Sequence, residues 1–137
     1  MTAPAYIAKY QSVIDHFGRW PSFHDANVVD YQAPSSDGGS LEFTLHAWTM
    51  TQEVDSKGFF VLKDHALVTL RFEELSDLKM EEFRSGNILF GMVFSQLAGS
   101  PAFQVELDSV MDMSGSFTAL KGEVISVVVC TPDAKPA

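Results

Sequence analysis

Residues Leu41-Glu42-Phe43-Thr44-Leu45-His46-Ala47-Trp48 carry the pattern that decides the fold. The odd positions up to Ala47 are apolar, whereas the even positions place polar residues and a tryptophan on the opposite face. Successive side chains of a β-strand point to opposite faces, so this alternation is typical of a strand with one buried face. We therefore predict a half-buried strand here, whose odd-numbered residues contact a core.

Shorter strand patterns lie on both sides of this stretch. They cover residues 26–31, 59–62, 66–72, 87–94, 103–108, 117–120 and 124–129. The Gly-rich segment 35–40 predicts the turn of a hairpin. Residues 87–94 are apolar on both faces, which predicts a central strand. Residues 49–58 are polar and predict a loop, while weak helical spacing in residues 73–84 leaves a helix and an ordered loop both open.

One amphipathic helix is predicted before the strands. Its apolar residues are spaced by three and four positions: Tyr6, Ile7, Tyr10, Val13, Ile14 and Phe17. This spacing places them on one stripe of a helix from about Pro4 to Phe17, and Gly18 is suited to end it. About seven short strands after a single helix predict an α+β fold that is mainly antiparallel β. We expect the helix to pack on a curved sheet or a small sandwich.

A chain of 137 residues, with 46% hydrophobic and 20% charged residues, is expected to fold as one domain over residues 1–137. Its β-rich body spans about residues 26–130, and residues 131–137 are expected to fray. The one cysteine excludes an internal disulfide. Because neither a signal-peptide pattern nor an apolar run long enough to cross a bilayer is present, we expect a cytoplasmic protein that binds no membrane.

The net charge of −9 argues against binding to nucleic acid, because a phosphate backbone selects clustered Lys and Arg. Five acidic residues are concentrated within ten positions: Glu73, Glu74, Asp77, Glu81 and Glu82. Within residues 73–84, only Lys79 and Arg84 offset them. Two interpretations stay open: a solvated surface, or a docking surface that attracts a basic protein partner.

The segment Trp20-Pro21-Ser22-Phe23-His24-Asp25 holds the residues that most suggest a chemical role. His24 and Asp25 are adjacent, so in an extended segment their side chains point to opposite faces and form no imidazole–carboxylate couple. If the chain turns here, Asp25 accepts hydrogen bonds from backbone amides and His24 bonds a carbonyl, which is a structural role. A ligand or metal site would need this pair to converge with His46 and Trp48.

No other pattern predicts catalysis or a cofactor. The chain lacks metal-ligand spacings such as His-x-His, a Gly-x-Ser-x-Gly elbow and a phosphate-binding Gly-rich loop. Cys130 lies late in a β-branched strand, where an inert thiol is expected. We therefore expect no metal, no cofactor and no enzymatic activity. Five aromatic residues either line a pocket or close one end of the core: Trp20, Phe23, Trp48, Phe59 and Phe60.

The segment Phe17-Gly18-x-Trp20-Pro21-Ser22-Phe23-His24-Asp25-Ala26-x-Val28, followed by a Gly-rich turn and the strand from Leu41 to Trp48, resembles the bacterial immunity protein 50 family. That family belongs to the immunity proteins of polymorphic toxin systems. The resemblance implies a non-catalytic protein that binds a cognate toxin, often a nuclease or another hydrolase, and blocks it. It transfers no catalytic residues to this chain.

Three hypotheses follow for the function. The first is an immunity-type inhibitor that contacts a basic toxin through the acidic residues 73–82 and the polar segment Thr49 to Asp55. In this hypothesis the aromatic and histidine motif has a structural role; the motif comprises Trp20, Phe23, His24, Asp25, His46 and Trp48. The second is a small-ligand or metal site near His24, Asp25 and His46. The third is a structural module that dimerises through an exposed strand edge or an aromatic patch.

Overall fold

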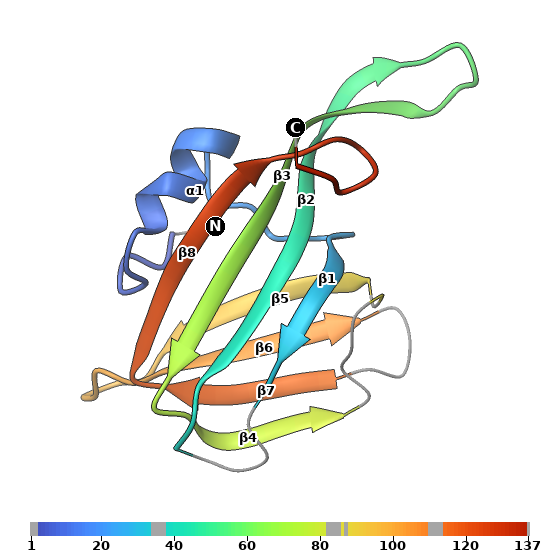
Figure 1. Cartoon of the computed structure of the whole chain (residues 1–137). Helices are drawn as coiled ribbons and strands as arrows, with labels where there is room; N and C mark the ends of the chain where they lie inside the picture. The colour runs from blue at the N-terminus through green and yellow to red at the C-terminus, as the bar shows by residue number, and fades with distance from the viewer. Residues whose placement is uncertain (1–2, 34–37, 82–85, 87, 110–113, 137) are drawn as a thin grey trace.

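The computed structural model describes residues 3–33, 38–81, 86, 88–109 and 114–136 (Figure 1). These residues form one helix, α1 (Tyr10–Phe17), and eight strands. The strands are β1 (Asn27–Gln32), β2 (Leu41–Val54), β3 (Phe60–Glu73), β4 (Ser76–Glu81), β5 (Leu89–Gln96), β6 (Phe103–Ser109), β7 (Ser114–Ala119) and β8 (Lys121–Val129). Neighbouring strands pair antiparallel, which confirms the prediction of an α+β fold that is mainly antiparallel β.

The strands form two four-stranded sheets. The first sheet has the order β1-β2-β3-β8, and the second has the order β4-β7-β6-β5. Figure 1 shows the first sheet lying across the second, with strands that run in clearly different directions, and α1 lying beside β8. The two sheets pack face to face, as the prediction of a small sandwich with one helix requires.

One core fills the space between the sheets. Its fully buried side chains come from both sheets: Leu41, Phe43, Leu45, Leu70, Phe72, Leu89, Met92, Phe103, Leu107 and Phe117. Trp20 and Phe23 also belong to the core, with their ring centroids 5.8 Å apart. The odd-numbered residues from Leu41 to Ala47 are buried, which confirms the pattern that predicted this strand, and His46 on the opposite face is buried as well.

The helix is shorter than predicted, because it begins at Tyr10 and not near Pro4. The residues before it pair with a strand instead. The amide of Ala8 donates a hydrogen bond to the carbonyl of Gly122, and the carbonyl of Ala8 accepts one from Val124. These bonds engage backbone groups that a longer helix would need for its own hydrogen bonds.

The acidic segment 73–84, where it is described, contains a strand and not a helix or a loop. β4 pairs with β7 and forms one edge of the second sheet. Leu78 and Met80 pack against the core, while Asp77 and Glu81 are exposed, so the side chains alternate with a period of two. The apolar spacing that indicated a helix was therefore misleading, because contact with the core sets the period here.

β5 is an edge strand, and the prediction that residues 87–94 form a central strand is wrong. Leu89 and Met92 are buried, whereas Phe90 and Val93 are 58% and 45% exposed. The ring of Phe90 contacts the imidazole of His24 at a centroid distance of 5.2 Å. The second apolar face of this strand is therefore at the surface, beside His24.

β2 and β3 extend beyond the rest of the first sheet as a projecting two-stranded arm, residues 49–64 (Figure 1). β1 pairs with β2 no further than His46, and β8 pairs with β3 no further than Ala66. The prediction of a loop over residues 49–58 is wrong for Thr49 to Val54, which continue β2. The two strands predicted between residues 59 and 72 form one strand, β3. Polar composition here reflects distance from the core and not the absence of a strand.

The tail, which we expected to fray, folds back as a turn in its described part. The amide of Thr131 donates a hydrogen bond to the carbonyl of Lys135 at 2.8 Å, and Cys130 pairs with Pro136. These backbone bonds fasten the chain end to the first sheet. Among the described residues, no helix has the length and the apolar composition that crossing a bilayer would require.

Candidate functional site

One face of the arm is apolar and exposed to solvent. Met50 pairs with Leu62, and Val54 pairs with Phe60. Directly paired residues of antiparallel strands share a face, and Leu62 and Phe60 are two apart in β3, so all four side chains lie on one side despite a register shift in β2 between Met50 and Val54. They are 54%, 38%, 56% and 52% exposed, respectively. We call these four residues the arm face.

The arm is a preformed hairpin. At its turn, the carboxylate of Asp55 accepts hydrogen bonds from the amides of Lys57 at 2.8 Å and Phe59 at 3.1 Å. Across the two strands, the hydroxyl of Thr51 donates to the carbonyl of Val61 at 2.7 Å. Such side-chain to backbone bonds hold turns and strand ends in place. The arm face is therefore presented in a defined geometry before any partner binds.

An exposed apolar face on a projecting hairpin is a candidate interaction site. Hairpins without a third strand or a packed helix are marginally stable in water, so a partner that covers one gives it support. Phe59, which follows the turn, is 68% exposed and places one more apolar side chain at the tip of the arm. Contiguous exposed apolar surface on a soluble domain indicates binding to a protein or another large partner.

A cleft of about 210 Å³ lies where the arm leaves the first sheet. Four of the motif residues predicted from the sequence line it, namely Phe23, His24, Asp25 and Trp48. Phe17 at the end of α1 and Met50 of the arm face complete its apolar wall. We call it the motif cleft. Because Met50 belongs to both, the motif cleft and the arm face are neighbouring parts of one surface.

His24 and Asp25 contact each other, contrary to the expectation for an extended segment. Phe23 and Asp25 have φ values of 60° and 69°, so the chain turns here. The turn brings Nε2 of His24 to 3.5 Å from Oδ2 of Asp25. The Nδ1–H of His24 donates to the carbonyl oxygen of Phe90 at 2.7 Å, which is the carbonyl bond predicted for a turn.

This geometry determines which nitrogen of His24 is available. Because a carbonyl accepts from Nδ1, the neutral imidazole keeps its lone pair on Nε2, the atom that faces Asp25. The side chains of His24 and Asp25 are 52% and 43% exposed, so water screens their interaction. Among the described residues, no three His, Cys, Asp or Glu side chains are grouped as metal ligands. The pair forms a polar wall of the cleft that can bind a ligand or a partner's side chain.

His46 does not line the motif cleft. It is buried beside the base of the arm, where its Nε2 lies 2.9 Å from Nδ1 of His65 and one ring donates a hydrogen bond to the other. The ring of Trp48 contacts both imidazoles, at centroid distances of 5.0 and 5.9 Å. The structure therefore brings Trp48 together with His24 and Asp25, but it places His46 in a separate pair.

The pairing of buried His46 with half-buried His65 predicts that stability depends on pH. Burial lowers the pKa of His46 below its usual 6.5, and the neighbouring His65 lowers it further. The unfolded chain, in which His46 regains its ordinary pKa, then binds more protons than the folded chain. The stabilisation from neutral His46 is complete above about pH 6.5 and is lost as the pH falls below that value towards the folded pKa. We expect the urea midpoint to fall between about pH 7.5 and pH 5.5.

A matched pair of variants isolates this effect. His46→Gln removes the titrating group and should flatten the fall in urea midpoint, whereas the exposed His24→Gln should leave the fall unchanged. Urea unfolding followed by tryptophan fluorescence at both pH values makes the comparison. Equal pH dependence in wild type and His46→Gln would contradict the assignment to His46.

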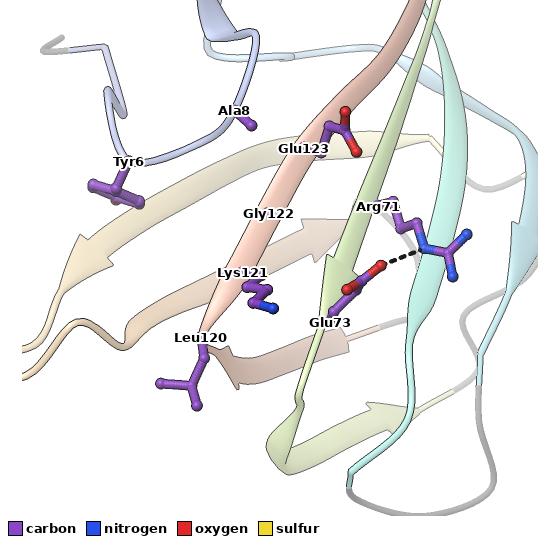
Figure 2. Close-up of a pocket in the computed structure, with 8 residues that line it drawn as sticks. All are labelled: Tyr6, Ala8, Arg71, Glu73, Leu120, Lys121, Gly122 and Glu123. Carbon is purple, nitrogen blue, oxygen red and sulfur yellow. Dashed lines mark ion pairs between the residues drawn. The ribbon is translucent and has the colours of Figure 1, made fainter.

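Two of the five acidic candidates are paired with basic side chains. The carboxylate of Glu73 lies 3.0 Å from Arg71, and that of Glu74 lies 3.7 Å from Lys121. Figure 2 shows the first pair at a second cleft of about 290 Å³ beside β8. The lining of that cleft holds two basic side chains and two acidic ones, Glu73 and Glu123. Because these charges offset each other, this region attracts a charged partner less than the sequence suggested.

The remaining acidic candidates belong to the edge of the second sheet. Asp77 and Glu81 are exposed on β4, and Glu82 lies outside the described residues. Charged side chains on an edge strand also discourage unwanted pairing with other sheets, which is a structural reason for their presence. Of the predicted acidic surface, Asp77 and Glu81 are therefore the described residues that face solvent on β4.

No family model matches the chain, and no curated protein or solved structure shows significant similarity to it. The likeness to the immunity protein 50 family therefore rests on the motif residues alone. Sequence reasoning missed the arm face, because Met50 and Val54 fall in a segment interpreted as a loop. The sequence did hold a signal for this hairpin. Met50 and Val54 precede the turn formed by Asp55 to Gly58, and Phe60 and Leu62 follow it, so apolar residues lie on both sides of the turn.

Proposed function

We propose that this chain is a non-enzymatic protein-binding domain, and more specifically an immunity-type inhibitor that blocks a toxin by covering it. The observation that carries the proposal is the arm face, whose four apolar side chains are all exposed on an ordered hairpin. Small ligands are usually enclosed in concave pockets, whereas a projecting apolar surface suits a macromolecular partner. The motif residues quoted for the immunity protein 50 resemblance lie directly beside this face.

The charge of the chain supports a basic partner. The arm holds three acidic and two basic residues, so eight of the nine excess negative charges lie in the rest of the chain. Long-range attraction accelerates encounter with a positively charged protein, and the apolar arm face then supplies short-range contact. A nuclease toxin must bind a polyanion and so presents basic surface, which an acidic inhibitor complements.

The test couples recovery of a partner to suppression of its toxicity. The tagged chain is purified from its native host, the co-purifying proteins are identified, and each is expressed with and without the chain. We expect a basic protein whose toxicity the chain suppresses. Phe60→Ser with Leu62→Ser should abolish suppression while leaving the unfolding transition within about 0.5 kcal/mol, because both side chains are exposed.

A second variant separates long-range electrostatic attraction from short-range apolar contact. Asp77→Lys with Glu81→Lys should slow association at low salt without changing dissociation, since these exposed residues act through charge. Suppression that survives the arm substitutions unchanged would reject the arm face as the binding surface. If the chain recovers no toxic partner at all, the inhibitor function is rejected.

The second candidate function is a small-ligand site in the motif cleft. It is favoured by one observation, the shared lining of His24, Asp25 and Trp48. The cleft measures about 210 Å³, which is below the roughly 300–1,000 Å³ of typical ligand pockets, so we rank it second. Native mass spectrometry of the purified chain distinguishes the two, because a retained small molecule without a protein partner would favour this candidate.

A further inference from the structure

We propose that the partner is held by β-augmentation: an extended segment of it, with alternating apolar and basic side chains, pairs with the free edge of β2 over residues 47–54. This inference rests on the proposed function and specifies the contact through which the partner is bound. In β-augmentation, backbone hydrogen bonds to an open sheet edge supply affinity, and pockets for alternate side chains supply specificity.

The edge of β2 is open where it enters the arm. β1 covers the first part of β2, and their last pair is Asn27 with His46. From Ala47 to Val54, the pairs of β2 are with β3 on the other side, with register shifts between Ala47 and Thr49 and between Met50 and Val54. Among residues 3–33, 38–81, 86, 88–109 and 114–136 no strand lies on the open side. An added segment would therefore pair with β2 on the same side as β1 does in the first sheet.

The opposite edge of the arm is less open where it leaves the sheet. The carbonyl of His65 accepts a hydrogen bond from the amide of Cys130. The carbonyl of the neighbouring Asp64 accepts one from Nε2–H of His16 at 2.8 Å. These bonds occupy backbone acceptors of β3 at the base of the arm. Along the edge of β2 from Ala47 to Val54, the described structure has one such bond, in which the amide of Glu53 donates to Oγ1 of Thr51 at 3.2 Å. The edge of β2 is therefore the more open template.

The side chains beside this edge select the composition of the added segment. Alternate residues of the segment would lie on the same side as Met50 and Val54, where apolar side chains extend the arm face. The motif cleft lies at the inner end of the same edge, because Ala47 to Met50 form part of its lining. One side chain of the segment would enter this cleft beside Trp48.

Charge selects basic residues at the other positions. Asp25 in the motif cleft and Glu53 on the arm lie along this edge, and Arg19 in the cleft lining offsets one of them. The body of the chain adds most of the net charge of −9. A segment that alternates apolar and basic side chains therefore complements both the apolar arm face and the negative electrostatic potential of the domain.

The test uses the full chain labelled with nitrogen-15, and a synthetic peptide of four Val-Lys pairs as the probe. We expect saturable shifts of the backbone amide signals of residues 47–54 as the peptide is added at low salt. We also expect slower hydrogen exchange at alternate amides there, namely those that point away from β3. A peptide of four Val-Glu pairs, which has the opposite charge, should produce neither change.

Two controls isolate the backbone contact and the side-chain contact. The Val-Lys peptide methylated at every backbone nitrogen keeps its side chains and charge but loses its donors, and it should bind at least about tenfold more weakly. Met50→Ser should weaken binding of the unmodified peptide by about tenfold, because it removes an apolar contact at the edge. Leu120→Ser, at a residue that is 46% exposed beside the second cleft, should leave binding unchanged.

Several results would overturn the inference. Equal binding of the methylated peptide, or shifts confined to β4, would show attraction by charge without strand addition. Slower exchange at residues 47–54 that grows with protein concentration, in the absence of peptide, would assign the edge to a second copy of the chain. These readouts are independent of toxin suppression. If the chain suppresses a toxin but the amides of residues 47–54 are not protected, only the β-augmentation is rejected. If these amides are protected but the chain suppresses no toxin, only the inhibitor function is rejected.

Discussion

Replacing Phe72 with alanine is expected to lower the free energy of unfolding by about 3–5 kcal/mol. Phe72 is fully buried, and its ring lies 5.1 Å from Phe117 and 5.8 Å from Phe43. It also contacts Phe103 and Phe94 at 6.1 and 6.2 Å, so it joins side chains of both sheets. Alanine would leave a cavity that four surrounding rings cannot fill. Urea unfolding followed by tryptophan fluorescence measures the change.

The matched control for this prediction is Phe59→Ala. Phe59 is 68% exposed at the tip of the arm, so its removal should change the free energy of unfolding by no more than about 0.5 kcal/mol. Phe72→Leu, which keeps much of the buried volume, should fall between the two. Equal losses for Phe72→Ala and Phe59→Ala would contradict the placement of Phe72 at the centre of the core.

Gly122→Ala is expected to destabilise the fold by about 1–3 kcal/mol through overpacking. A Cβ atom at this position would lie 2.6 Å from Cδ1 of Ile7, 3.0 Å from Cζ of Phe103 and 3.2 Å from Cδ1 of Phe72. All three side chains are buried, so none can move away without disturbing the core. The glycine is therefore required for the close crossing of the amino-terminal segment over β8. Thermal unfolding by circular dichroism measures the loss.

Two other glycines provide controls for this prediction. At Gly91 an added Cβ meets no atom within 4 Å, so Gly91→Ala should be neutral or slightly stabilising. At Gly115 the nearest atom is the sulfur of Met80 at 2.7 Å, and that flexible, partly exposed side chain can turn away at small cost. Combining Gly122→Ala with Ile7→Val, which removes the clashing methyl group, should cost less than the two changes added together. Full additivity would show that Ile7 is not the obstacle.

The sequence predicts this fold well where the core sets the pattern. The alternation from Leu41 to Ala47 is visible because every second side chain of β2 enters the core. The fold class follows from many short strands and a single helix. β4 was missed because its strand is short, and Leu78 and Met80 also satisfy a weak helical spacing.

The candidate site was less predictable because it depends on contacts distant in sequence. Nothing local shows that residues 49–54 continue β2, since their partners lie beyond the turn in β3. His24 meets the carbonyl of Phe90, which is 66 positions away, and Ala8 is drawn out of the helix by β8. Such pairings come from the packing of the whole chain, so propensity and periodicity do not reveal them.

The position of the arm outside the core has an evolutionary consequence. None of the four arm-face residues belongs to the core or to the apolar residues that pack against it. Substitutions there should cost little in folding, because stability is set by the two packed sheets. Under the proposed function, the arm could therefore diversify its choice of partner while the body stays under constant selection for packing, which is the arrangement that an arms race between an inhibitor and its target would reward.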